Sequence, residues 1–81
     1  MPKIHELKIL PEYFRAVTNR EKQFELRKDD RNFKVGDTLI LKEWDGNEYT
    51  GRRAGLYIIT YILRDCEEYG LKDGYCIIGF Y

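Results

Sequence analysis

From residue 21 to residue 27 the chain reads Glu-Lys-Gln-Phe-Glu-Leu-Arg, and apolar and polar residues alternate along this stretch. Successive side chains of a β-strand point to opposite faces, so the alternation predicts a strand over residues 23–27. Phe24 and Leu26 then share one face, which we expect to pack on a core. Glu25 and Arg27 lie beside each other on the opposite face.

Lys22 stands at the entrance of this predicted strand, next to Glu25 and Arg27. One carboxylate between an ammonium and a guanidinium makes a compact polar cluster on a rigid element, where a binding site is best held. The same residues also fit a solvated outer face with an ion pair that contributes little, because charge on the open face of an antiparallel strand is common. The spacing alone leaves both interpretations open.

The composition limits the classes of function that the chain can have. The chain has 81 residues, which is one domain with a thin core, and 43% apolar residues are too many for a disordered segment. The net charge is zero, with nine Lys or Arg against six Asp or Glu in residues 1–34 and five against eight in residues 35–81. A protein that binds nucleic acid mainly by releasing counterions is more basic than this. Any nucleic-acid role must therefore use a local patch or pocket.

The chain has two cysteines, Cys66 and Cys76, and a single histidine, His5. These are too few for a metal site, and we expect neither a metal nor another cofactor. Cys76 lies in an apolar run and is expected in the core, while a disulfide to Cys66 stays open. The N-terminus has no apolar signal segment and no run is long enough to span a membrane. We therefore expect a cytoplasmic protein with reduced thiols and no membrane partner.

The pattern along the chain predicts mostly strands. We expect strands at residues 5–10, 23–27, 38–44, 56–63 and 74–81. Another strand is expected to start at residues 48–51 and to end at a bend at 52–55. A helix is expected at residues 11–19, and a loop with one helical turn at 64–73. Tyr13, Phe14 and Val17 form a helical apolar stripe expected in the core, and Asn19 is expected to adopt the left-handed cap. The predicted fold is mainly β with one or two short helices, as a small barrel with the helix over one opening.

Several motifs in this order resemble the small ASCH-type domains of the PUA-like superfamily, and most closely a group of uncharacterised bacterial and phage proteins. They lie at residues 5–9, 22–27, 30–31, 33–37, 43–44, 49–52 and 70–75. The resemblance covers nearly the whole chain and implies a single PUA-like β-barrel domain over residues 1–81. It also implies recognition of RNA or a nucleotide-like ligand in a cleft beside the Lys22-x-x-Glu25-x-Arg27 strand.

The chain departs from the ASCH pattern at one place. ASCH domains usually carry a glycine just before the Lys-x-x-Glu-x-Arg motif, whereas this chain has Arg20 and Glu21 there. We expect a differently shaped turn between helix and strand, with Arg20 adding charge to the rim of the cleft.

A catalytic branch of the superfamily, small amidohydrolases that act on acylated cytidine, is also similar to this chain. Those enzymes use a Lys, a Thr and a Glu, and Lys22 matches their Lys. Glu25 stands where their Thr is expected, which removes the hydroxyl acyl acceptor. A carboxylate can still act as a general base on water, so Lys22 and Glu25 would be the catalytic pair of this alternative.

Candidate ligand contacts follow from side-chain chemistry. Arg27, Lys28 and Arg31 are predicted to contact phosphate, with solvated basic residues as the plainer interpretation. Trp44, at the end of a strong strand, is predicted either to stack on a base or to pack at the end of the barrel.

In the binding hypothesis, Glu25 accepts a hydrogen bond from a base edge and Lys22 holds it in place. His5 is predicted to face Glu25 across the cleft, because we expect their strands to be neighbours, or else to be a structural histidine. A third hypothesis is a phage or bacterial regulator that acts by protein interaction, which an exposed apolar patch away from the cleft would favour.

Overall fold

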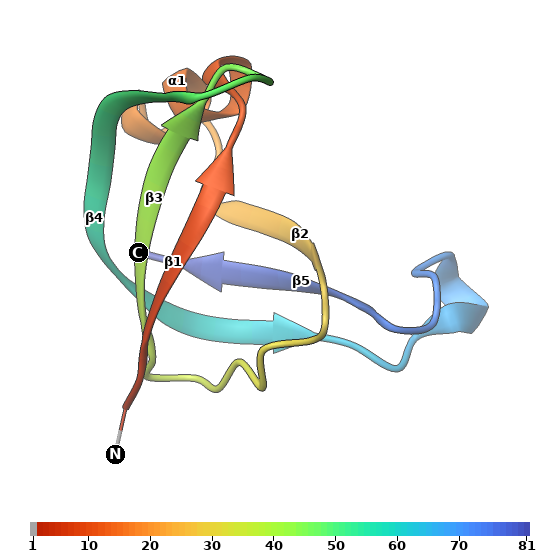
Figure 1. The fold of residues 1–81 in the computed structure, drawn as a ribbon. Coiled ribbons are helices and arrows are strands. Elements are labelled where there is room, and N and C mark those ends of the chain that lie inside the picture. The colour runs from red at the N-terminus through yellow and green to blue at the C-terminus, as the bar shows by residue number, and fades with distance from the viewer. Residues whose placement is uncertain (1) are drawn as a thin grey trace.

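The computed structural model of the protein describes residues 2–81. Within this range one five-stranded sheet is accompanied by one α-helix and one short 3-10 helix (Figure 1). In chain order the elements are β1 (Ile4–Ile9), α1 (Pro11–Thr18), β2 (Phe24–Lys28), β3 (Thr38–Trp44), β4 (Tyr49–Leu63), the 3-10 helix (Glu67–Tyr69) and β5 (Tyr75–Phe80). The predicted positions of the helix and of four of the strands are confirmed to within two residues, and the 3-10 helix lies inside the loop at residues 64–73 that was predicted to hold a helical turn.

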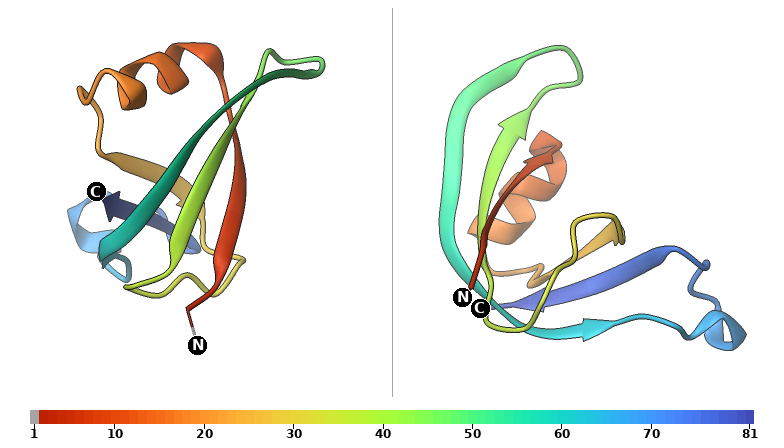
Figure 2. Two further views of the ribbon diagram at one scale, coloured as in Figure 1. Left: turned by 90° about the vertical axis from the view of Figure 1, so that its left-hand side faces the viewer. Right: turned by 60° about the horizontal axis from the view of Figure 1, so that its bottom comes forward.

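The strand order is β1-β3-β4-β5-β2, with β1 parallel to β3 and every other pair antiparallel. The long strand β4 joins the two halves of the sheet, since its first part pairs with β3 and its last part with β5. Figures 1 and 2 show how β4 curves from one half into the other. The predicted bend at residues 52–55 is instead part of β4, where register shifts and the positive φ of Gly51 and Gly55 let the strand curve without ending.

The sheet is curled but does not close into the predicted barrel. β1 and β2 are its two edges and have no backbone pairing with each other, so they are not neighbours in the sheet, contrary to the expectation from the sequence. Arginine side chains cross between the edges instead: Arg27 donates to the carbonyl oxygen of Lys8, and Arg31 Nη1 donates to that of Glu6 at 2.9 Å. A long side chain spans a separation that a backbone N–H group cannot reach. These contacts occupy two carbonyl groups of an otherwise open edge.

The core lies on the inner face of the sheet, under α1. It consists of Leu7, Ile9, Phe14, Val17, Phe33, Leu39, Leu41, Ile59, Cys76, Ile78 and Phe80. Phe14 and Val17 are buried as predicted, but Tyr13 is 45% exposed and does not belong to the core. Cys76 is fully buried as expected, and both cysteines are free thiols. Among residues 2–81, no helix has the length and apolar composition needed to cross a membrane.

The two faces of β2 are the reverse of the prediction. Phe24 and Leu26 are 48% and 58% exposed on the outer face, whereas Glu25 is only 5% exposed on the inner face. Cys76 and Ile78 of β5, the strand that pairs with β2, already fill the adjacent core. Alternation separates the two faces of a strand but does not determine which of them is inside.

Leu26→Ala tests this orientation. We expect it to lower the free energy of unfolding by less than about 0.5 kcal/mol, because the side chain is largely in water already. Ile78→Val removes a single buried methyl group and is expected to cost about 1 kcal/mol. Urea denaturation of both variants compares them directly. A larger loss for Leu26→Ala than for Ile78→Val would place Leu26 in the core.

Candidate functional site

The connection between α1 and β2 begins with a tight helix end. The N–H of Glu21 donates to the carbonyl of Ala16 at 2.8 Å, and the N–H of Arg20 donates to that of Val17 at 3.0 Å. This pair of hydrogen bonds is the Schellman pattern, which needs one residue in the left-handed region. That residue is Arg20, with φ 63°, and not Asn19 as predicted, whose φ is −85°. The turn therefore places the Arg20 backbone directly after the helix.

Lys22 and Arg27 both contact Glu25, so the three side chains form the cluster that the sequence predicted, but on the buried side of β2. The Lys22 ammonium contacts one carboxylate oxygen of Glu25 and also donates to the carbonyl of Phe24 at 2.6 Å. Arg27 donates to the other oxygen of Glu25 from Nε at 3.1 Å. The side chains of Lys22 and Arg27 are 17% and 23% exposed. The cluster carries a net charge of +1 and ties the start of β2 to its middle.

A cavity of about 300 Å³ lies beside this cluster. Tyr13, Lys22, Phe24, Glu25 and Leu26 line it. The Lys22 ammonium is 5.5 Å from the centre of the Tyr13 ring and 4.9 Å from that of Phe24. The exposed Tyr13 thus forms one wall of a hollow between α1 and β2. Here Lys22 and Glu25, the pair of the hydrolase hypothesis, face the same space.

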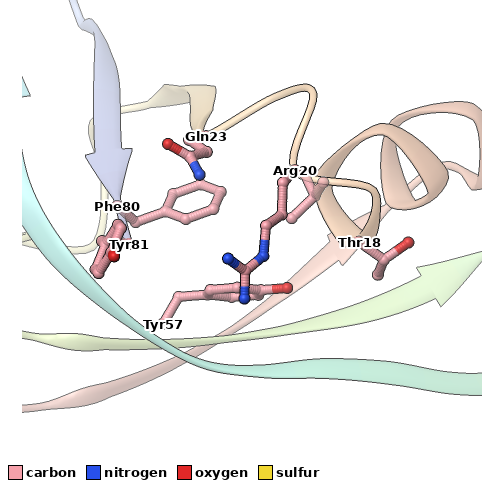
Figure 3. Close-up of a pocket in the computed structure, with 7 residues that line it drawn as sticks. Thr18, Arg20, Gln23, Tyr57, Phe80 and Tyr81 are labelled. Carbon is pink, nitrogen blue, oxygen red and sulfur yellow. The ribbon is translucent and has the colours of Figure 1, made fainter.

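A second cavity of about 300 Å³ lies between the end of α1, the start of β2 and the strands β4 and β5 (Figure 3). It is lined by Val17, Thr18, Arg20, Gln23, Tyr57, Phe80 and Tyr81. In Figure 3 the Arg20 side chain extends from the turn toward the ring of Tyr57. The Tyr57 ring packs on Phe80 with 5.1 Å between ring centres, which helps to hold it in place. A cation, an amide and an aromatic ring therefore share one hollow.

His5 is held by a buried network near the start of β1. Its Nε2 atom lies 2.8 Å from a carboxylate oxygen of Asp37, and its ring packs on Phe33 with 4.8 Å between ring centres. His5 and Asp37 are 7% and 3% exposed. These contacts support the structural interpretation of His5 and account for its orientation without Glu25.

Three further predicted site residues lie apart from the two cavities. The Lys8 ammonium lies over one face of the Trp44 ring, 4.3 Å from the ring centre, so a base that stacks on that face would have to displace this side chain. Lys28 is exposed at the end of β2, in register with Tyr75. Arg31 donates to β1, as described above.

Sequence reasoning missed Gln23 and Tyr57 as cavity residues. The alternation already placed Gln23 on the face of Glu25 and Arg27, so a signal for it was present. Its carbonyl accepts a hydrogen bond from the N–H of Phe80 at 3.1 Å, which holds it beside β5. Tyr57 gave no comparable signal, because one tyrosine in an apolar strand does not show that distant elements will form a hollow around it.

The fold and the site together define a small mixed-sheet domain with two hollows near the place where α1 joins the edge strand β2. Residues 4–80 match the family described as "Domain of unknown function (DUF3850)", and the chain belongs to this family. A relative from Escherichia phage P2, the "Uncharacterized 12.9 kDa protein in GpA 3'region", is 51% identical over 53 residues, which are 65% of this chain. The matched segment is 49% of the phage protein, so the chain spans about half the length of that relative.

Proposed function

We propose that this domain binds RNA or a nucleotide-like ligand where α1 meets β2. The observation that supports the proposal most is the cavity of about 300 Å³ that Arg20, Gln23 and Tyr57 share. A guanidinium matches the geometry of a phosphate, an amide has donors and an acceptor for a base edge, and an aromatic ring offers a stacking face. Stacking of a base on such a ring contributes about 1–3 kcal/mol.

The cluster of Lys22, Glu25 and Arg27 also favours a ligand site here, both structurally and electrostatically. Its contacts fix the start of β2, and its net positive charge favours an anionic ligand nearby. The resemblance of the motif at residues 22–27 to ASCH-type domains points to the same class of ligand. Direct phosphate contacts from Arg27, Lys28 and Arg31 stay a prediction, and both arginines already donate to β1 carbonyl oxygens.

Backbone amide shifts measured by NMR test the proposal without altering the protein. We expect titration with a mixture of the ribonucleoside 5′-monophosphates, and separately with short single-stranded RNA, to shift the amides of Arg20, Gln23 and Tyr57. The amides of Asn47 and Glu48 are the internal control, because both donate to Asp45 in the turn between β3 and β4, outside both cavities.

The position of the shifts decides between the hypotheses. Shifts confined to Tyr13, Lys22 and Leu26, together with turnover of an acylated nucleoside, would favour the hydrolase alternative at the other cavity. Shifts at Lys28 and Trp44 would instead indicate that the ligand binds outside the two cavities, at residues that the sequence predicts as ligand contacts. No shift with either titrant at millimolar concentration would contradict the proposal.

A further inference from the structure

Arg20 occupies a backbone position that glycine usually takes. Its φ of 63° lies in the left-handed region, which the helix end requires at this residue. A side chain with a Cβ atom is disfavoured there, and glycine is not. The turn explains the conformation, but it does not explain the choice of arginine. Backbone strain at one residue is a reason to look for a function of its side chain.

The Arg20 guanidinium also lacks a partner within the described part of the chain. Among residues 2–81 it makes no hydrogen bond or ion pair, whereas Arg27, Arg31 and Arg64 all donate to carboxylate or carbonyl oxygens. Its side chain lines the second cavity and extends toward Tyr57 (Figure 3). Five N–H donors of a permanent cation are therefore free beside an aromatic ring.

We propose that this cavity takes a single nucleotide unit that carries a phosphate monoester, with the phosphate on Arg20 and the base against Tyr57. The inference rests on the proposed function and narrows its ligand. A volume of about 300 Å³ is at the lower end for small-molecule sites, so it suits one nucleotide and not a duplex. A phosphate monoester with this chemistry comes from a free mononucleotide or from the phosphorylated end of an RNA strand.

Calorimetric titration tests the phosphate contact. Each ribonucleoside 5′-monophosphate and its parent nucleoside are added to wild type, Arg20→Gln and Arg15→Gln. We expect the best monophosphate to bind wild type at least roughly tenfold more tightly than its nucleoside, as a charge-assisted hydrogen bond allows. Arg20→Gln is expected to remove this difference by weakening the binding of the monophosphate. Arg15→Gln removes the same charge from the last turn of α1, outside the cavity, and is expected to keep the difference.

A second variant distinguishes loss of the phosphate contact from loss of folding stability. Arg20→Gly is expected to lose the preference for the monophosphate while its urea midpoint rises, because glycine relieves the left-handed residue. RNA with a 5′-phosphate and RNA with a 5′-hydroxyl are then compared. A preference for the phosphorylated end assigns the ligand to RNA, and tight binding of the free monophosphate alone assigns it to a mononucleotide, and either result supports the inference.

Three results would overturn the inference. Equal binding of nucleoside and monophosphate to wild type, or an equal loss in Arg15→Gln and Arg20→Gln, would refute the phosphate contact and leave the proposed function intact. Failure of every nucleoside, nucleotide and RNA to bind wild type would refute the proposed function as well.

Discussion

Glu25→Gln is expected to lower the free energy of unfolding by about 3 kcal/mol, the lower end of the range for breaking a buried ion pair. The substitution keeps the shape of the side chain and removes its charge. Lys22 and Arg27 are then left mostly buried without a carboxylate between them. Arg27 also loses the partner that orients it toward the carbonyl of Lys8, so the link between the two sheet edges is weakened as well.

The matched control is Glu6→Gln, because Glu6 also pairs with a lysine, Lys42, at 3.4 Å, but its side chain is 55% exposed. We expect that substitution to cost less than about 0.5 kcal/mol. The double variant Glu25→Gln/Lys22→Met is expected to recover part of the loss, since one of the two uncompensated cations is gone. Urea denaturation measures all three. If Glu25→Gln lowers the free energy of unfolding no more than Glu6→Gln does, the cluster behaves like exposed surface ion pairs. It would then not serve as a rigid support for the candidate site.

Most elements of this fold could be predicted from the sequence because their signals are local, whereas the continuous strand β4 was predicted as two strands with a bend between them. β3 matches its predicted range of residues 38–44, and α1 begins at Pro11 as predicted. The closed barrel was wrong for a non-local reason. Whether a curled sheet closes depends on the strand order and on how far apart its edges lie. Within residues 2–81, β1 and β2 do not pair, and the side chains of Arg27 and Arg31 donate to β1 instead.

The candidate site could likewise be predicted only in part. Period-two spacing predicted that Glu25 and Arg27 lie side by side, and they do. It did not predict that they face inward, because both faces of the alternating stretch are consistent with the same spacing. Tyr57 is more than 30 positions away from Arg20 in the sequence, and the fold brings the two residues to one cavity between the end of α1 and β4. The hollow is therefore a property of the whole sheet.

Asp37→Asn is expected to lower the free energy of unfolding by about 2 kcal/mol at neutral pH. The Asp37 carboxylate accepts hydrogen bonds from the N–H of Lys3 at 3.0 Å, from the N–H of Lys34 at 3.1 Å and from His5 Nε2 at 2.8 Å. It thereby joins β1 to the turn before β3, at 3% exposure. An asparagine keeps one acceptor oxygen and turns an amino group toward donors, which leaves buried N–H groups without a partner.

The pH dependence gives this prediction a second readout. Burial alone would raise the pKa of the Asp37 carboxyl, but the hydrogen bonds from His5, Lys3 and Lys34 outweigh it and hold the pKa below the ordinary value of 3.8. A lowered pKa in the folded state stabilises the protein above the ordinary value, and this stabilisation is lost as the pH falls below it and through the folded pKa. The stability difference between wild type and Asp37→Asn should therefore be largest at neutral pH and shrink in acid.

Asp45→Asn is the control for this experiment. Hydrogen bonds from the N–H groups of Glu48 and Asn47 also lower the pKa of Asp45, but this carboxylate lies in an exposed turn. Water replaces its lost contacts, so we expect a much smaller change in the urea midpoint than for Asp37→Asn. A stability difference for Asp37→Asn that stays constant from neutral pH into acid would show that the charge of Asp37 does not stabilise the fold. The junction between β1 and β3 would then depend on the pairing of the two strands and on the packing of His5 against Phe33.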